Sequence, residues 1–289
     1  MEGAITSGAD KTSLQVTLTG GEVQGRKVAK RGYKVNGVGR RKSDFVGKLT
    51  VALFRPEDLE IITDSPTLRR EFLDGVLTQV DREYRRSLVS YEKGLRRRNK
   101  LLTLIRDGEI PRSTLAFWDQ LLVKEGTVLT GKRRELIEFI NLQPMIENRR
   151  WLQYDFSAIS ESRLKQYAEE ELAAGYTLVG PHRDDFSIFA EELQAENQDN
   201  KELGRDLAKY GSRGQQRMAV FWLKLGELAF IETKNDERPV LLLDDIFSEL
   251  DDQHDRLVMN LVGKQQTIIT TTEVDERFEK IEGVEVIEI

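Results

Sequence analysis

The sequence contains no cysteine, only two histidines and no long apolar run. The lack of cysteine excludes disulfides, thiolate metal sites and cysteine nucleophiles. The two histidines lie far apart in the sequence, which argues against a histidine metal cluster. No apolar stretch approaches the roughly 20 residues that span a bilayer, and the N-terminus lacks the basic and apolar blocks of a signal peptide. These absences predict a cytoplasmic protein that makes no membrane contact.

The charge of the chain is acidic overall but uneven. The net charge is −6 over 289 residues, so the chain as a whole is not a polycation. Nine Lys or Arg residues and only two Glu residues lie between Arg82 and Arg106, and a local basic face can bind a phosphate backbone. The candidates are Arg82, Arg85, Arg86, Arg96, Arg97, Arg98 and Lys100. A solvated helix face explains such a run equally well, so the sequence alone leaves DNA contact open.

Residues 1–60 have the pattern of a small antiparallel sheet. Polar and apolar residues alternate from Ser13 to Thr19, which is the period of a strand. Gly20-Gly21 and Asn36-Gly37 are turn signals, and Leu49–Phe54 reads as a more buried strand.

Residues 61–175 have helical periodicity and are predicted to form an inserted, all-helical arm. Ser65-Pro66 is typical of an N-cap followed by proline at the first helical position. The later helices are expected at Arg82–Arg106, from Ser113 to about Trp151, and at Ser160–Ala174.

Residues 176–289 return to mixed α/β structure and are predicted to form a C-terminal lobe. A helix is expected at Gln215–Thr233. Val240–Leu243 and Thr267–Thr271 are apolar runs of the buried, parallel-strand kind. Shorter strands are expected at Tyr176–Val179 and at Val284–Ile289.

The strongest chemical motif is the run from Pro239 to Asp245, in which four apolar residues precede two carboxylates. Ligands bind at the carboxyl ends of strands in α/β sheets, and this run has the Walker B pattern. Asp244 would hold Mg²⁺ directly or through water, and Asp245 would polarise the attacking water. A core strand that ends in two solvated acids gives the same pattern, because this motif is common.

Two further motifs favour an ATPase of the ABC type. Ser248-Glu249-Leu250-Asp251 follows at the spacing of the D-loop SxLD, in which Ser248 and Asp251 are the matching polar residues. Upstream, Ser212-Arg213-Gly214-Gln215 resembles the ABC signature SGGQ, with Arg213 in place of the first glycine. A serine-capped helix N-terminus with a nearby glycine favours a phosphate. Either motif alone would also fit an ordinary N-capped helix.

The sequence has no usable P-loop, which requires G-x-x-x-x-G-K-[ST]. The nearest match, Gly126–Arg133, places arginine where a hydroxyl should bind Mg²⁺, and amphipathic helical sequence surrounds it. We therefore expect it to be part of the arm, and we expect the P-loop to lie upstream of Met1. Without the P-loop lysine and its backbone cradle, the chain by itself should not hydrolyse ATP.

The chain resembles the RecF family in blocks that lie outside the ATPase motifs. Phe54-Arg55-Pro56-Glu57-Asp58-Leu59, Ser65-Pro66 and Arg69–Asp74 are similar to its F-x-P-E-D-L and P-x-x-R-R-x-F-L-D blocks. Gly180-Pro181-His182-Arg183-Asp184-Asp185 is similar to its GPHRDD block, for which we predict no secure role. The threonines Thr270–Thr272, where many ABC proteins carry a switch histidine, also fit the family.

This resemblance implies an α/β fold with an ABC-type, P-loop-NTPase-like head that is incomplete at its N-terminus and carries a helical arm. It implies ATP and Mg²⁺ as cofactors, with Ser212, Gly214 and Gln215 contacting ATP held by a second subunit. RecF-like proteins form ATP-dependent homodimers and bind single-stranded and junction DNA. They assist RecA loading with RecR and RecO, in recombinational repair and the SOS response, and their hydrolysis is slow.

Two alternatives stay open at the level of sequence. The chain could be a non-hydrolysing binding module that kept the fold and the arm, which predicts no ATP affinity even with a P-loop supplied in trans. It could also be another SMC-like ATPase head. Such heads lead into very long heptad coiled coils, whereas this arm consists of short helices.

Overall fold

The computed structural model describes residues 2–7, 10–23, 26–144, 149–191, 204–246, 256, 258–272 and 283–287. The N-terminal part forms an antiparallel sheet in the order β1-β2-β5-β6, with β3 and β4 as a separate hairpin. Asn36 and Gly37 both have positive φ, which gives β5 and β6 the tight hairpin expected of Asn-Gly. The bounds are β1 Glu2–Ser7, β2 Asp10–Leu18, β3 Glu22–Val23, β4 Arg26–Lys27, β5 Arg31–Val35, β6 Val38–Arg40 and α1 Lys42–Phe45.

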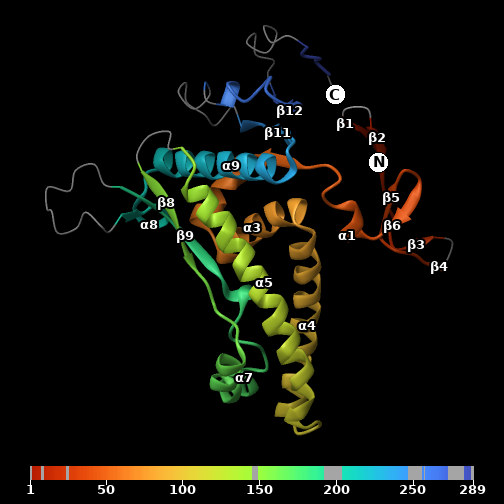
Figure 1. The fold of residues 1–289 in the computed structure, drawn as a ribbon, viewed down its shortest axis with the longest axis vertical. Helices are drawn as coiled ribbons and strands as arrows, with labels where there is room; N and C mark the ends of the chain where they lie inside the picture. Colours follow the sequence, from red (N-terminus) through yellow and green to blue (C-terminus); the bar gives the residue numbers. More distant parts are fainter. Residues whose placement is uncertain are drawn as a thin grey trace, which may run out of the picture.

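A three-stranded parallel sheet joins distant parts of the chain. Its order is β12-β11-β7, formed by Thr267–Thr270, Val240–Asp244 and Val51–Phe54. The helix α9 (Arg213–Asn235) lies along this sheet, between it and the helices α3 and α5 (Figure 1). Since parallel strands end at the same edge, the residues that follow β7 and β11 are brought to one side of the sheet.

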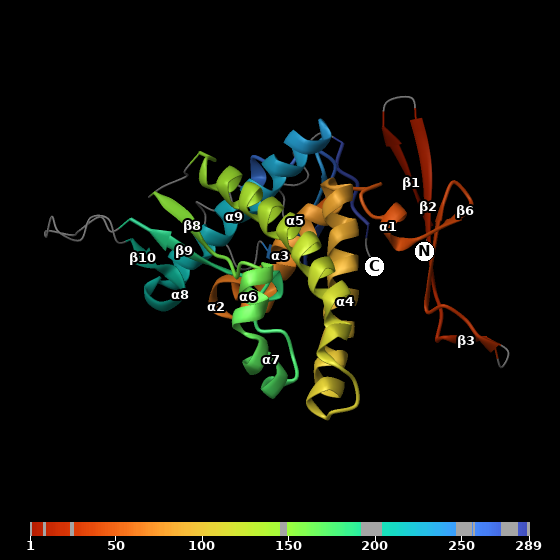
Figure 2. The ribbon, with the colours of Figure 1, turned by 60° about the horizontal axis from the view of Figure 1, so that its bottom comes forward.

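The helical part is built around the pair α4 and α5, which extends away from the head (Figures 1 and 2). Asp81 caps α4 by accepting a hydrogen bond from the Tyr84 backbone N–H at 2.9 Å, and Gly108 follows its end with φ of 78°. The bounds are η1 Pro56–Leu59, α2 Glu60–Thr63, α3 Pro66–Val80, α4 Arg82–Arg106, η2 Arg112–Leu115, α5 Ala116–Asn141, α6 Glu161–Gln166, α7 Ala168–Ala174, η3 Pro181–Arg183 and α8 Leu207–Tyr210.

A small antiparallel sheet in the order β10-β9-β8 corrects the C-terminal end of the helix predicted from Ser113 to about Trp151. Its strands are β8 (Arg150–Asp155), β9 (Asp185–Ala190) and β10 (Arg205–Asp206). The expected helix from Ser113 to Trp151 is therefore wrong at its C-terminal end. Asn141 closes α5, and its side chain donates to the Leu152 carbonyl and accepts from the Leu152 N–H, at 3.0 and 2.7 Å.

Two predicted strands are also wrong. At Tyr176–Val179 the chain is irregular, because side chains rather than a neighbouring strand satisfy its backbone. Asn99 accepts from the Thr177 N–H at 2.9 Å, and Glu171 accepts from the Leu178 N–H at 2.8 Å. In the predicted strand Val284–Ile289, residues 284–287 have no strand structure, and residues 288 and 289 lie outside the described residues. The division of the chain at 60/61 and 175/176 stays a prediction, and β8 pairs with β9 across the second boundary.

Two hydrophobic clusters share α9. The larger one contains Trp222 and Phe230 of α9 with residues of α3, α4, α5, β8 and β9. The smaller one contains Phe221 and Leu228 of α9 with residues of β7 and β11. One helix therefore contributes opposite faces to the helical part and to the parallel sheet.

Candidate nucleotide-binding site

The Walker B strand is the central strand of the parallel sheet. Leu241 and Leu243 of β11 are 0% and 1% exposed, which accounts for the apolar run. β11 pairs with β7 on one side and β12 on the other, and Asp244 is its last residue. Asp244 is exposed, so the predicted metal ligand lies at the carboxyl edge where its carboxylate is accessible.

Thr270, the last residue of β12, holds both acidic residues. Its hydroxyl donates to Asp244 Oδ1 at 2.6 Å. The Asp245 N–H donates to the Thr270 carbonyl at 3.1 Å and to its hydroxyl at 3.2 Å. Asp245 has a φ of 47°, a left-handed conformation that turns the chain sharply at the strand end. The threonine therefore orients both acidic residues through hydrogen bonds.

The signature residues lie at the N-terminus of α9, which begins at Arg213. Ser212 is the N-cap and forms a capping box with Gln215, with hydrogen bonds of 3.2 and 2.9 Å. Ser212, Gly214 and Gln215 are all exposed. A Cβ added at Gly214 would meet no atom of the described residues within 4 Å, so nothing in that part of the chain requires glycine there. The exposed, positively polarised end of a long helix suits a phosphate.

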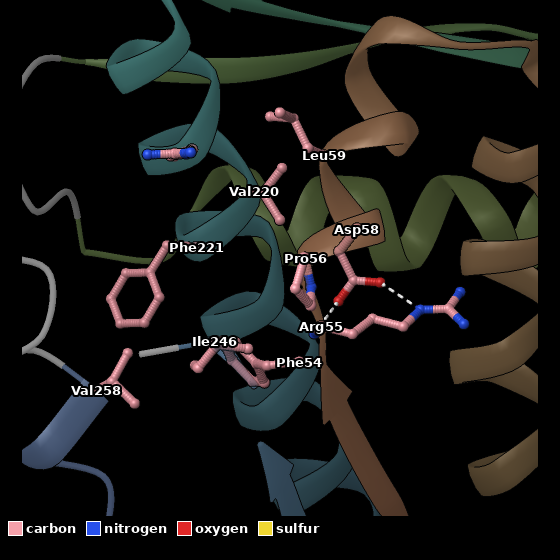
Figure 3. A pocket seen from close by; sticks show the side chains of 10 residues that line it. Phe54, Arg55, Pro56, Asp58, Leu59, Val220, Phe221, Ile246 and Val258 are labelled. Carbon is pink, nitrogen blue, oxygen red and sulfur yellow. Dashed lines mark hydrogen bonds and ion pairs between the residues drawn. The ribbon is translucent and has the colours of Figure 1, made fainter. Parts of the chain in front are cut away.

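A small cavity lies between the beginning of α9, the end of β7 with η1, and the segment after β11 (Figure 3). Its volume is about 100 Å³, and it is lined by Phe54, Arg55, Pro56, Asp58, Leu59, Arg217, Val220, Phe221, Ile246 and Val258. Because Arg217 comes soon after the signature residues and Ile246 follows the Walker B acids, both motifs lie on this side of the head.

A buried charged group connects α9 to η1. Lys224 of α9 is 5% exposed and pairs with Glu227 at 2.5 Å, and its ammonium lies 4.0 Å from Asp58. Burial raises the pKa of Glu227, and the charge of Lys224 acts in the opposite direction. The loop after β7 is thereby tied to the helix that carries the signature residues.

The rejected P-loop match lies inside a helix, as predicted. Gly126–Arg133 is part of α5, and Gly126 is packed so closely that an added Cβ would lie 2.7 Å from Ile159. Arg133 is 2% exposed and pairs with Asp74 at 2.7 Å and with Asp184 at 3.0 Å. This segment has no backbone loop that could cradle a phosphate.

The GPHRDD block is a structural junction. The Pro181 carbonyl accepts from Arg133 at 2.7 Å, and Asp184 also accepts from Tyr154. The His182 ring lies 2.8 Å from the Tyr91 hydroxyl and 3.1 Å from the Thr177 carbonyl. Burial lowers the pKa of His182 to about 4, despite the opposing hydrogen bond to Thr177, so its imidazole is neutral at pH 7. This junction gives His182 a structural hydrogen-bonding role.

The structure corrects one of the predicted DNA-contacting residues. Arg98 is 2% exposed and pairs with Asp119 and Glu171, both at 2.7 Å, so it faces the arm interior and not a ligand. Arg96, Arg97 and Lys100 are exposed on the other side of α4. The apolar spacing of Tyr91, Gly94, Leu101 and Leu102 around Arg98 was a signal in the sequence for this burial.

The predicted D-loop residues Ser248 and Asp251 lie outside the described residues. Within the described ranges, no group of three metal-ligating side chains forms a cation site. None of the described helices combines the length and the apolar character required to cross a membrane.

Comparison with known proteins identifies the family, although no protein-family model matches the chain. The chain is 35% identical over 264 residues to the DNA replication and repair protein RecF of Herpetosiphon aurantiacus, covering 84% of this chain and 65% of that protein. Its identity to RecF of Lachnoclostridium phytofermentans is 34% over 263 residues, with coverage of 87% and 70%. RecF of Thermomicrobium roseum is 34% identical over 303 residues, with coverage of 92% and 73%. The chain thus spans about two thirds of the length of these relatives.

Solved structures agree with this assignment. The recombination mediator protein RecF of the RecFOR pathway, as RecF-ATPrS, has a TM-score of 0.78 at 29% identity, covering 94% of this chain and 74% of that one. The RecF-ATP structure has a TM-score of 0.76 at 30% identity, and the match covers 92% of this chain and 72% of that one. The predicted ABC-type ATPase fold is therefore confirmed. Its sequence and its fold both show that the chain belongs to the RecF family of DNA replication and repair proteins.

Proposed function

We propose that this protein acts as an ATP-gated DNA-binding switch of the RecF type. In this role it dimerises on ATP, binds single-stranded and junction DNA in the cytoplasm, and assists RecA loading with RecR- and RecO-type partners in repair and the SOS response. One observation carries the proposal. An exposed, serine-capped helix N-terminus and two acids at a parallel strand end lie on the same side of a RecF-family head.

Each residue in this site has a defined task in the proposal. Asp244 would hold Mg²⁺, whose preferred ligands are one or two carboxylates together with phosphate oxygens and water. The exposed Asp244 carboxylate, oriented by Thr270, fits that ligand set. The ion would neutralise phosphate charge when bound. Asp245 would polarise the attacking water, and Ser212, Gly214 and Gln215 would contact ATP held by the other subunit. Ser248 and Asp251 would form the D-loop contact.

Replacing Gly214 with leucine should abolish ATP-dependent function without weakening the fold. A Cβ there meets no atom of the described residues within 4 Å, so we expect stability to change by less than about 0.5 kcal/mol. The leucine side chain would occupy the space that a phosphate needs. The measurement is ATP binding and turnover in a mixture with a P-loop-bearing RecF relative whose own signature serine has been replaced, so that only this chain can complete the composite site.

The wild-type chain should raise turnover in that mixture at least about tenfold over the relative alone, and Gly214→Leu should not. Leucine at Lys124, an exposed residue of α5, is the matched control and should behave as wild type. Absence of any wild-type effect on ATP binding would favour the alternative, a binding module that lost nucleotide chemistry. Turnover by the purified wild-type chain alone would contradict the expected need for a P-loop in trans.

Replacing the neighbouring residues Arg97 and Arg98 one at a time distinguishes a contact with DNA from a structural role in the arm. Arg97→Gln should weaken binding to a duplex with a single-stranded tail and leave the urea midpoint unchanged, because Arg97 is exposed. Arg98→Gln should lower the free energy of unfolding by about 3 kcal/mol, because Glu171 is then left buried without its partner. Fluorescence anisotropy and urea unfolding measure the two effects, and equal DNA affinity of Arg97→Gln and wild type would remove α4 from the proposal.

A further inference from the structure

A polar cleft of about 450 Å³ lies between the N-terminal sheet and the beginning of α4. It is lined by Val35, Arg40, Ser43, Asp44, Val46, Gly47, Lys48, Arg82 and Arg85. The short helix α1 lies beside the first turns of α4 in both views of the ribbon, which places the cleft at the base of the arm (Figures 1 and 2).

The cleft carries an excess of positive charge. Four of its lining residues are cationic and one, Asp44, is acidic. Among the residues that the structure describes, no carboxylate lies within ion-pair distance of Arg40, Lys48, Arg82 or Arg85. Burial, followed by the neighbouring charge of Arg82, lowers the pKa of Arg85, and the charges of Asp44 and Asp81 act in the opposite direction. Unpaired cations that line one concave surface favour an anionic ligand.

The wall of the cleft is a fixed structure. The Arg85 guanidinium donates to the Thr78 and Ser43 carbonyls, both at 2.7 Å, and so joins the end of α3 to α1. Gly47 has a φ of 81°, and an added Cβ would lie 2.4 Å from the Gln79 carbonyl oxygen. The loop that carries Lys48 is thus held against α3 and α4 by a close approach that only glycine permits. A preorganised wall binds an anion with a smaller entropic cost than a mobile one.

The positive surface continues from the cleft along α4. Arg82 lines the cleft and is also the first residue of this surface. The residues that follow it are Arg86, Lys93, Arg97 and Lys100, at successive spacings of four, seven, four and three residues, and all five are exposed. These spacings place the side chains on one helix face. At a rise of about 1.5 Å per residue, the stripe from Arg82 to Lys100 is about 27 Å long. A single phosphate ion cannot occupy such a length, whereas a nucleic-acid backbone can.

We propose that the cleft between the N-terminal sheet and α4 binds backbone phosphates of DNA that lies along the exposed face of α4. This inference rests on the proposed DNA-binding function and adds a specific site, with Arg40, Lys48 and Arg82 as phosphate contacts and Arg85 as the residue that positions the wall. The contacts are to phosphate, so the cleft supplies affinity and register and not base specificity.

The test compares two triple variants of the full chain with equal loss of charge. Arg40→Gln, Lys48→Gln and Arg82→Gln together remove the cleft cations, and Lys124→Gln, Lys165→Gln and Lys264→Gln together remove exposed cations elsewhere. The probe is a duplex with a single-stranded tail, followed by fluorescence anisotropy from about 50 to 200 mM salt. Circular dichroism and urea unfolding establish that both variants fold.

The cleft variant should bind at least about tenfold more weakly at about 100 mM salt, and its plot of log Kobs against log salt should be shallower by about 2 to 3. The control variant should change affinity by less than about threefold. If the wild type binds the duplex and the two variants bind it with equal affinity, the cleft site is overturned but the proposed function is not. If the wild type does not bind the duplex, the result counts against the proposed function as well. Displacement of the duplex by millimolar inorganic phosphate, at ionic strength held constant with chloride, would assign the cleft to free phosphate and also overturn the proposal.

Discussion

Replacing Arg133 with methionine should lower the free energy of unfolding by about 3–5 kcal/mol, measured by urea unfolding at pH 7. Arg133 lies in the middle of α5, and its guanidinium pairs with Asp74 of α3 and with Asp184 of the GPHRDD block. Asp184 is fully buried, so the variant leaves a carboxylate in the protein interior without its cation. Methionine fills a similar volume, which makes loss of charge pairing, and not a cavity, the cause of the effect.

The control for Arg133 is Lys124→Met on the same helix. Lys124 is exposed, so its replacement should change the free energy of unfolding by less than about 0.5 kcal/mol. Adding Asp184→Asn to Arg133→Met should restore part of the lost stability by removing the buried charge. The amide oxygen still accepts from the Ser157 N–H, and the Tyr154 hydroxyl can rotate to accept from the amide N–H. Equal stability of Arg133→Met and wild type would show that the GPHRDD block does not depend on this pairing.

Lys224→Met should lower the free energy of unfolding by about 3 kcal/mol at pH 8 and by less at pH 5. Lys224 and Glu227 form a buried pair on α9, and burial already raises the pKa of Glu227 in the wild type. A carboxyl group whose folded pKa lies above its unfolded value binds a proton more tightly in the folded state. Its protonation therefore stabilises the fold at low pH, and this contribution is lost as the pH rises through the folded pKa.

The sign of that pH dependence separates a charge effect from a packing effect. Loss of the Lys224 ammonium removes the influence that opposes the raised pKa of Glu227, so the pH-dependent part should grow in the variant. The difference in stability between the double variant Lys224→Met with Glu227→Gln and the single variant Glu227→Gln should be nearly independent of pH between 5 and 8, because His182 and the other titrating groups contribute equally to both. Urea midpoints at several pH values measure the stability of these variants. If Lys224→Met loses the same stability at every pH, the effect comes from lost packing against Phe54 and Phe72.

The sequence predicted the elements that carry strong local signals. The helix α4 has the bounds expected from its charged run, because Asp81 caps it and Gly108 ends it. The strand β11 is where the apolar run predicted it. The strand β8 was missed, because Trp151 and Leu152 follow a long amphipathic helix and extend its pattern. Pro144, which cannot continue a helix, was the local signal against that extension.

The sequence predicted those parts of the candidate site that follow from local sequence patterns. The placement of Ser212 at a helix cap and of Asp244 at a strand end follows from local patterns. Arg98 was misassigned because composition does not distinguish the buried side of a helix from the exposed side, whereas its partner Glu171 comes from a distant helix. Arg40 and Lys48 were missed because the cleft exists only where the N-terminal sheet meets α4. Tertiary contacts of this kind have no local sequence signal.

The position of α9 between two hydrophobic clusters has a consequence for the order of folding. The helices α3, α4 and α5 are close in sequence and can form early, since local contacts cost little loop-closure entropy. Val51 of β7 pairs with Val240 of β11 from near the other end of the chain, so the parallel sheet must wait until α9 has docked and brought β11 back. Among the strands that the structure describes, β7 pairs with β11 alone, so during synthesis this pairing forms only after Asp244 has been made. In that interval its apolar side chains would be a target for chaperones.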